Sequence, residues 1–445
     1  MADTVVASNS AIAVKRYSKT LSFMAAREPT TLTSLTGPMP EEDETLSAVR
    51  RGKLASSQHM PVLRVDELTK GAGDKVQVDC GQISKFVAIM GDENAEGRGP
   101  SIDYSTQDLY LNMATLPISA GGKMSQQRTE HDLRKNAVAQ LAEAMPRFRW
   151  QRSLVHMAGA RGKSDGVDWI LPADASTGPD SGLATLMVNA VKAPTYNRHF
   201  VVSAGTLIQG GAQLASILTT DVMRLSVVDE FAAIWSEMAI RMRPIRIPGD
   251  PAAGDAPIKG VLFMDQLVWD NFITDPTASN NIRKWEADAI RRADYGNLRQ
   301  HPLFSGQVMM WQDILIRRMN FPIRFDASDA VAHVPVANRY LTTSNETNIT
   351  VAAGLSTTHQ VARSLFLGAQ ALAVVSGGNS MSEETYTLLE KHTDNFGRHS
   401  EFAGELMGAE GKLRWSFPSA TSAGTLEPTD YGVAVIDSVV RKRPT

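Results

Sequence analysis

The chain has 445 residues, of which 43% are hydrophobic, and a formal net charge of −3 at pH 7. This length and composition are typical of a globular protein with one or two sizeable cores, and the negative net charge argues against a dedicated nucleic-acid binder. A single cysteine, Cys80, excludes an intrachain disulfide and a multi-cysteine zinc site. The sequence shows no run of eighteen apolar residues and no signal-peptide pattern, so we expect no membrane partner.

The first 74 residues and the segment after them lack the apolar content of an independent core. Residues 1–74 are rich in Ser, Thr, Pro and charge, so they are either disordered or ordered by another surface. From Lys75 apolar residues alternate with polar ones, and a second alternating run surrounds Leu109 to Met113, beyond a glycine-rich stretch at 91–100. This predicts a long hairpin, which is marginal alone and needs contacts from a neighbouring subunit.

A long helix is predicted from Glu130 to about Ala160, spanning on the order of 45 Å. Its apolar face carries Leu133, Ala137, Leu141, Met145, Phe148 and Val155. The opposite face carries most of Arg134, Lys135, Gln140, Glu143, Arg147, Arg149 and Arg152. Thr129 and Asp132 are the candidate N-cap pair, and Pro146 predicts a kink near 142–145 or a break into two collinear pieces. Taken alone, the pattern also fits an ordinary amphipathic core helix.

The remaining elements are mixed in order. Residues 161–222 read as irregular, and a second helix capped by Ser226 and Asp229 runs to Pro244. We then expect strands at 245–247 and 261–264, a helix from Ser279 to Tyr295, and a further strand within 301–316. The end of the chain adds a buried segment of ambiguous type at 364–375, an alternating strand at 413–417 and a core strand at 431–440. Because helices and strands do not strictly alternate, the fold class is α+β.

Motifs for catalysis or cofactor binding are either incomplete or absent. GARGKS at 159–164 ends like a phosphate-binding loop, but the first glycine of that motif is replaced by Met157. The segment from Asp92 resembles half a calcium loop, but its twelfth position is Asp103 instead of glutamate. HExxH and GxSxG motifs are absent from the sequence. We therefore expect no catalytic residues, no cofactor and no metal, although an enzyme built from distant residues stays an alternative.

Several ordered blocks carry a resemblance to a known family. They are GGKMSQQRTEHDLRKNA (121–137), NRHFVVSAG (197–205), MRPIRI (242–247), GVLFMD (260–265), HPLFSGQVMMWQDILI (301–316), RSLFLGAQALAVVSG (363–377) and DYGVAVID (430–437). Together they resemble the major capsid proteins of enquatrovirus-like (Schitoviridae-type) short-tailed phages, within the Hong Kong-97-type capsid lineage. The most telling residues are Gly121, Gly122, Lys123, Met124, Gln127, Arg128, Asp132, Leu133 and Arg134.

The resemblance implies an α+β Hong Kong-97-type fold with five parts. Residues 1–74 would be an N-terminal arm and 75–120 an extended loop lying across a neighbouring subunit. Residues 121–257 would form the peripheral domain, with the long helix as its spine and an insertion near 161–222. Residues 258–376 would form the axial domain. The last part, 377–445, would return to the sheet of the peripheral domain.

The resemblance also implies a structural function and no enzymatic activity. Hexamers and pentamers of the chain would form an icosahedral shell around double-stranded DNA, with a portal protein at one vertex and possible scaffold and decoration proteins. The shell would be assembled in the cytoplasm of the bacterial host and end as the virion capsid. Deleting residues 1–70 is then expected to leave soluble subunits that form no stable shells. The alternatives are an encapsulin-like compartment and an α+β enzyme such as a hydrolase.

Overall fold

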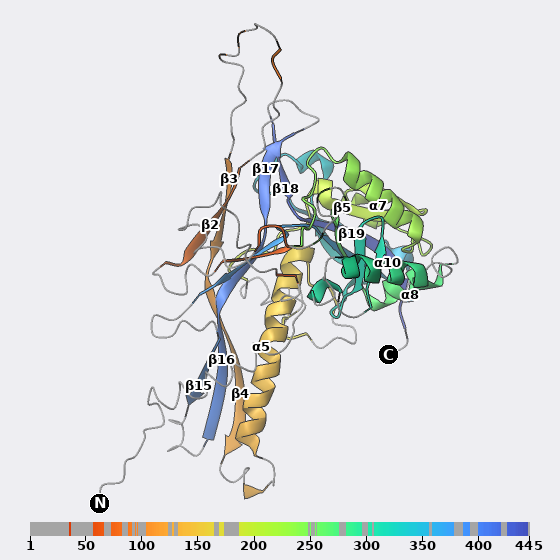
Figure 1. The fold of residues 1–445 in the computed structure, drawn as a ribbon. Coiled ribbons are helices and arrows are strands. Elements are labelled where there is room, and N and C mark those ends of the chain that lie inside the picture. The colour runs from red at the N-terminus through yellow and green to blue at the C-terminus, as the bar shows by residue number, and fades with distance from the viewer. Residues whose placement is uncertain are drawn as a thin grey trace, which may run out of the picture.

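The computed structural model describes most of the chain beyond the first 56 residues. The described residues are 35–36, 57–65, 73–81, 88–90, 94, 96, 104–122, 127–128, 132–163, 169–172, 187–247, 250, 254, 256–275, 282–295, 301–304, 307–355, 358–377, 386–391, 399–419 and 425–443. An elongated part is built on one long helix, and a wider body lies beside its C-terminal end (Figure 1). Within the described residues, none of the helices is long and apolar enough to cross a membrane.

The elongated part contains a five-stranded sheet and the helix α5 (Leu133–Ala158). The sheet has the order β1-β14-β16-β15, and β4 pairs with β16 on the side opposite β15. Its strands are β1 (Val62–Val65), β4 (Asn112–Gly122), β14 (Leu372–Ser376), β15 (Tyr386–Lys391) and β16 (His399–Lys412). Helix α5 packs along β4 and β16, where Leu141 and Phe402 share one apolar cluster.

The body contains an eight-stranded sheet with the order β6-β5-β19-β13-β7-β9-β8, and β10 pairs with β13. Its strands are β5 (His199–Ser203), β6 (Thr206–Gln209), β7 (Gly260–Met264), β8 (Met309–Trp311), β9 (Ile314–Arg318), β10 (Ile323–Phe325), β13 (His359–Leu367) and β19 (Val433–Arg441). The central strands are buried along almost their whole length, as expected for continuous apolar runs such as GVLFM in β7.

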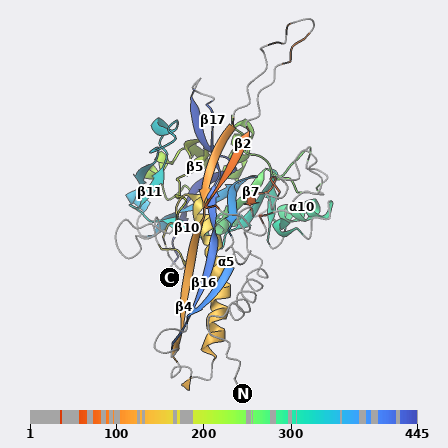
Figure 2. The same cartoon turned by 90° about the vertical axis from the view of Figure 1, so that its left-hand side faces the viewer.

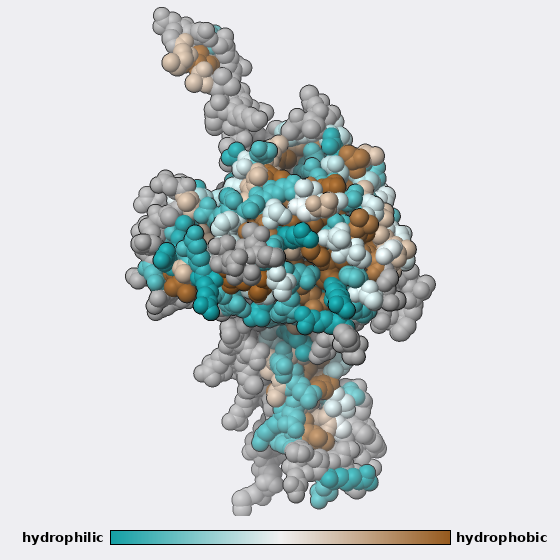
Figure 3. Space-filling view, turned by 90° about the vertical axis from the view of Figure 1, so that its right-hand side faces the viewer, coloured by the Kyte–Doolittle hydropathy of each residue, from teal (hydrophilic) through white to brown (hydrophobic). Residues whose placement is uncertain are grey.

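Three helices cover one face of this sheet: α7 (Leu225–Glu237), α8 (Gln266–Thr274) and α10 (Ile282–Tyr295). Phe231 of α7 and Phe272 of α8 belong to one apolar cluster with sheet residues such as Phe366. The outer surface of this layer alternates hydrophilic residues with small hydrophobic patches (Figure 3). The opposite sheet face packs in a second cluster, which includes Trp150 and Leu154 from the C-terminal part of α5.

Three two-stranded sheets and several short 3-10 helices complete the fold. The small sheets pair β2 (Lys75–Gly81) with β3 (Tyr104–Tyr110), β11 (Ala330–His333) with β12 (Thr347–Thr350), and β17 (Arg414–Pro418) with β18 (Leu426–Asp430). The 3-10 helices are η2 (Tyr196–Arg198), η3 (Gly211–Ser216), η5 (Pro302–Phe304), η6 (Val336–Asn338) and η7 (Ala353–Leu355).

The long helix differs from its prediction at its start, its middle and its end. Asp132 is the N-cap and accepts a hydrogen bond from the backbone N–H of Lys135 at 3.2 Å, so α5 begins three residues after Glu130. The helix continues through Pro146, so of the two alternatives, a kink or a break, the break does not occur. Every residue from Trp150 to Ala158 is buried, including Arg152, which we had expected on the solvent face. This end of α5 lies between the two sheets, so no side of it meets water.

The hairpin prediction is correct in pairing, but the base of the hairpin needs no neighbouring subunit for support. Strands β2 and β3 pair antiparallel, with Val76 opposite Leu109. Both residues are buried in a cluster with Trp415 and Phe417 of the same chain. The base of the hairpin therefore packs on its own subunit, because the alternating apolar side of β17 faces it.

Other expectations need correction. Residues 199–209, expected to be irregular, form the strands β5 and β6. Helix α7 has no side-chain cap and ends at Glu237, seven residues before Pro244. Asp229 instead accepts hydrogen bonds from the Trp311 indole and the Gln312 amide. The apolar segment 364–375, whose type the sequence left open, forms parts of β13 and β14.

The C-terminal strands divide between the two large sheets. Strands β15 and β16 lie in the sheet packed on α5, where we expected residues 377–445 to return. Strand β19 instead lies between β5 and β13 in the eight-stranded sheet. Its run of buried apolar residues fits a central strand with both faces covered.

Candidate functional site

The resemblance-bearing residues lie along the connection from β4 to α5. Gly121 and Gly122 end β4, and Gly122 pairs with His399 of β16. Gln127 and Arg128 are exposed, while Lys123 and Met124 lie outside the described residues. The described motif residues therefore lie one after another, at the end of β4, in the connection and at the start of α5.

Three motif residues begin α5. Asp132 caps the helix, and Leu133 is its half-buried first residue. Arg134 forms an ion pair with Glu390 of β15, and its guanidinium lies 5.8 Å from the ring centre of Phe402 in β16. The arrangement ties the far end of the helix to two strands, which is a structural role.

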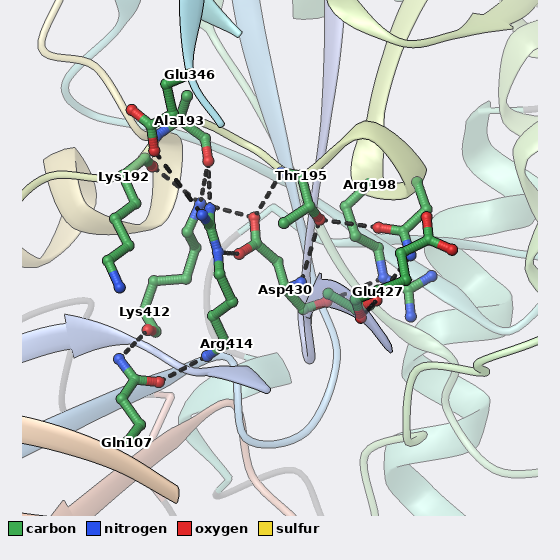
Figure 4. Close-up of polar contacts among 12 residues, drawn as sticks. Gln107, Lys192, Ala193, Thr195, Arg198, Glu346, Lys412, Arg414, Glu427 and Asp430 are labelled. Carbon is green, nitrogen blue, oxygen red and sulfur yellow. Dashed lines mark hydrogen bonds and ion pairs between the residues drawn. The ribbon is translucent and has the colours of Figure 1, made fainter. Parts of the chain in front are cut away.

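A buried ionic group, here the Asp430 cluster, joins four parts of the chain (Figure 4). The Asp430 carboxylate lies 2.7 Å from Lys412 Nζ and 2.7 Å from Arg414 Nε. It also accepts a hydrogen bond from the backbone N–H of Thr195 at 3.1 Å. The side-chain amide of Gln107 in β3 makes two hydrogen bonds to the backbone next to Asp430's partners. It donates to the carbonyl oxygen of Lys412 and accepts from the backbone N–H of Arg414. The cluster therefore connects the hairpin, the β16–β17 junction, β18 and residues 192–198.

Burial and charge oppose each other in this cluster. Burial alone would raise the pKa of Asp430, but the neighbouring Arg414 and Lys412 together hold that pKa below its usual value. Burial lowers the pKa of Lys412 to about 8, although Asp430 favours the charged form. Lys412 also donates to the carbonyl oxygens of Lys192 and Ala193, so its ammonium is surrounded by oxygen acceptors.

A second group, the Asp437 cluster, lies at the centre of the eight-stranded sheet. Arg363 of β13 donates two hydrogen bonds of 2.8 Å to the Asp437 carboxylate of β19. His199 of β5 lies with Nε2 2.8 Å from the same carboxylate. Burial opposes ionisation of Asp437, yet Arg363 and His199 hold its pKa well below the usual range. The three side chains join three adjacent strands.

A third group, the Glu410 cluster, joins α5 to β16. Arg152 forms an ion pair with Glu410, and Arg149 Nε lies 3.6 Å from the same carboxylate. Arg149 also donates to the Ser376 hydroxyl of β14 at 3.3 Å. The buried half of α5 is thus fixed to two strands of the five-stranded sheet by charge as well as by apolar packing.

The chemistry of these clusters favours mechanical connection over catalysis. A histidine beside a carboxylate resembles part of a catalytic triad. However, His199 is fully buried, and burial lowers its pKa. The Asp437 carboxylate is also engaged by Arg363. A fully buried ion pair that joins adjacent strands stabilises strand pairing instead of activating a nucleophile.

The motifs that we rejected from the sequence have structural explanations where they are described. Gly159 ends α5 with φ 71°, and a Cβ on Gly162 would lie 2.6 Å from the carbonyl oxygen of Arg324. The glycines of GARGKS are therefore required by close backbone packing. The calcium-like segment 92–103 lies largely outside the described residues. Among the described residues, no group of three or more His, Cys, Asp or Glu is placed to hold a metal ion.

Sequence reasoning missed all three clusters, yet a signal for one was present. Arg363 and Asp437 each interrupt an apolar run, in VARSLFL and AVIDSVV. A charged residue inside a buried strand requires a partner of opposite charge. The pairing of these two residues was not predictable, because it depends on which strands become neighbours.

A sequence model of the family described as phage capsid protein matches residues 5–442. A search of curated proteins finds no match. Among solved structures, the capsid of Ralstonia phage GP4 is similar over 100% of both chains, with 20% identity and a TM-score of 0.65.

Two further capsid structures share the fold. The cyanophage Pam1 capsid is similar over 100% of both chains, with 13% identity and a TM-score of 0.55. The match to the capsid of Helicobacter pylori bacteriophage KHP30 covers 90% of this chain and 94% of that capsid chain, with 12% identity and a TM-score of 0.51. The predicted α+β fold of the Hong Kong-97 type is confirmed.

Proposed function

Because this chain belongs to the phage capsid protein family, we propose that it is the major capsid protein of a short-tailed phage, of the enquatrovirus-like group. Hexamers and pentamers of the chain form the icosahedral shell around the double-stranded DNA genome. The observation that carries this proposal is the family match over residues 5–442, nearly the whole chain. That match also supports a virion subunit over an encapsulin-like compartment or a hydrolase.

The distribution of contacts within the subunit fits a shell function. The Asp430, Asp437 and Glu410 clusters join helices and strands that lie far apart in the sequence. Such a subunit transmits force without changing shape, which a pressurised container requires. The binding energy between subunits then comes from many modest contacts spread over large interfaces.

We assign the regions of a capsid subunit as follows. The elongated part on α5, β4, β15 and β16 is the peripheral domain, and the eight-stranded sheet with its helices is the axial domain. Strands β5 and β6 and helix α7 therefore belong to the axial domain, although they precede residue 258. Residues 1–74 are the N-terminal arm. Residues 75–111 are the extended loop, whose distal part contacts a neighbouring subunit, because β4 begins at Asn112 and lies in the sheet of the peripheral domain. Tyr104, which is 72% exposed, and Met90, which is 79% exposed, are apolar residues of that loop available for such a contact.

The other partners follow from the same proposal. A portal protein occupies one vertex, scaffold and decoration proteins act during assembly, and the inner surface lies near packaged DNA without reading its sequence. Assembly takes place in the bacterial cytoplasm, and no catalytic step by this chain is needed.

Electron microscopy of the purified recombinant protein, combined with sedimentation, tests the proposal. Closed icosahedral shells or flat sheets of hexamers are the expected result. A chain that stays monomeric even when co-expressed with the phage assembly proteins would contradict it.

A further inference from the structure

The small sheet of β11 and β12 is attached to the body by few side chains. It belongs to neither large sheet and lies at the edge of the body on the side away from α10 (Figure 2). Three of the four residues of β12 are exposed, and Ile349 is only partly buried. On β11 the buried residues are Val331, which packs in the large apolar cluster, and His333. Because a two-stranded sheet is marginal by itself, its position depends on these contacts.

His333 lies beside His199 of β5, with the backbone of η3 between them. A Cβ on Gly211 of η3 would lie 2.6 Å from His199 Cε1 and 2.7 Å from His333 Cβ, so only glycine fits at this position. His199 is fully buried, and His333 is 6% exposed. Both imidazole rings are therefore removed from water where the β11–β12 sheet meets the body.

Each of the two rings has a buried nitrogen atom without a hydrogen bond. His199 Nε2 lies 2.8 Å from the ionised Asp437 carboxylate, which can only accept, so Nε2 carries the proton and Nδ1 is an unprotonated acceptor. Among the described residues, neither His199 Nδ1 nor His333 Nδ1 has a partner. His333 Nε2 has one contact, with the Thr347 hydroxyl of β12 at 3.4 Å. A second proton on His333 would thus have no buried acceptor at Nδ1.

The surroundings also disfavour a positive charge on His333. Burial and the neighbouring His199 both lower the pKa of His333. The charges of Arg363 and Lys412 act on His199 in the same direction, and Arg363 Nη2 lies 3.5 Å from His199 Nε2. The segments η3 and β12, GAQLAS and TNIT, contain no charged side chain.

The carboxylates of this region are engaged elsewhere. Asp437 is held in its own cluster by two hydrogen bonds from a guanidinium. Glu346, in the loop before β12, accepts a hydrogen bond from the backbone N–H of Ala193 at 3.0 Å and lies 3.8 Å from Arg414 Nη1. No carboxylate in the described part of the chain forms an ion pair with His333.

We propose that protonation of His333 detaches the β11–β12 sheet from the body, while both large sheets stay folded. In the attached position the imidazolium lacks an acceptor and a counter-charge, and detachment exposes it to water, which supplies the missing hydrogen bonds. The inference goes beyond the proposed shell function and does not depend on it.

A single proton limits the size of this effect. The attached form has the lower histidine pKa, so the attachment weakens as the pH falls below the ordinary value of about 6.5. The largest possible increase in the detached population between pH 7.5 and pH 5 is about 30-fold, reached when the attached form stays unprotonated at pH 5. Above pH 7.5 the attachment should no longer depend on this residue's titration.

Hydrogen exchange of the full-length protein, read by mass spectrometry at pH 7.5 and pH 5 and corrected for the intrinsic exchange rate, tests the proposal. We expect peptides within residues 330–350 to exchange faster at pH 5, by up to about 30-fold. H333N should abolish this ratio between the two pH values, even if its sheet detaches more easily at both. H301N, which removes a half-buried histidine elsewhere, should retain it. Peptides of the histidine-free β17–β18 sheet should not respond.

Three outcomes would overturn the proposal. Unchanged exchange of residues 330–350 at pH 5 would show that the β11–β12 sheet stays attached in acid. An acid response retained in H333N would assign it to another group, such as His199. Equal acceleration in β17–β18 and in the two large sheets would mean that acid unfolds the whole subunit. Shell formation is measured separately by electron microscopy, so a failure of the proposed function would not be confused with any of these results.

Discussion

Arg363 and Asp437 lie directly opposite each other on β13 and β19, joined by two hydrogen bonds of 2.8 Å, with neither side chain exposed. Arg363 also donates to the carbonyl oxygen of Ala158, the last residue of α5, at 2.9 Å. One guanidinium thus links the centre of the eight-stranded sheet to the end of the long helix. This contact is one of several that join the body to the elongated part.

Replacing Asp437 with Asn should strongly destabilise the subunit. The change leaves the Arg363 charge buried without its counter-charge, and breaking such a pair costs about 3–5 kcal/mol. Urea denaturation of the purified subunit measures the loss. The exposed pair of Arg443 and Asp270 provides the control, because D270N there should cost about 0–1 kcal/mol.

The double variant R363M/D437L distinguishes the contribution of the ion pair to stability from the contribution of the space that the two side chains fill. Apolar residues of similar volume often replace a buried ion pair with little loss of stability. We therefore expect the double variant to be more stable than D437N. A double variant as unstable as D437N would show that the contacts of Arg363 with Ala158 O and of His199 with Asp437 matter more than the ion pair between Arg363 and Asp437.

The local elements of this fold were largely predictable, and their arrangement was not. The alternation in β2 and β17 and the apolar run in β7 predicted strands at the correct places, because these patterns record which side chains are buried. Strand β5 was missed, because its run HFVVS is short and lies between glycine- and proline-rich segments. The separation of β16 and β19 into different sheets depends on contacts between distant residues, which no local pattern encodes.

Buried histidines should make the subunit less stable in acid. Burial lowers the pKa of His156 to about 4, although the nearby Glu410 favours the charged imidazolium and partly opposes this shift. Between about pH 6.5 and 4 the unfolded chain therefore binds a proton that the folded chain does not, so the free energy of unfolding falls as the pH falls. The loss from this residue is roughly 3 kcal/mol in total. Urea midpoints at several pH values measure it, and H156Q should show a shallower decline than the unmodified protein.

Replacing Gly159 with Ala should destabilise the end of α5. Gly159 has φ 71°, and a Cβ there would lie 2.6 Å from the carbonyl oxygen of Lys192. The left-handed conformation alone costs a residue with a Cβ about 1–2 kcal/mol, and the clash adds to this cost. At Gly354 a Cβ meets nothing within 4 Å, so G354A is the matched control and should leave the thermal midpoint nearly unchanged. Equal effects of the two variants would refute the packing role of Gly159.

Asp132 should act as a helix cap and not as a residue of chemical function. Its side chain accepts a hydrogen bond from Lys135 N, and replacing such a cap with Ala costs about 1 kcal/mol. Serine also caps helices well, so D132S should retain most of the stability lost in D132A. Thermal denaturation compares the two. If D132S formed stable subunits but no shells, the carboxylate would have a role in assembly beyond capping.

Removing the N-terminal arm should prevent assembly without unfolding the subunit, but the deletion must end earlier than residue 70. Leu35 is fully buried and β1 pairs with β14, so a deletion of 1–70 would also damage the sheet. A chain lacking residues 1–30 keeps both features and should give soluble subunits with an unchanged circular dichroism spectrum but no stable shells. A chain lacking only residues 1–12 keeps most of the arm and should assemble normally. Sedimentation and electron microscopy compare the two, and normal shells from the longer deletion would show that neighbouring subunits hold together without the arm.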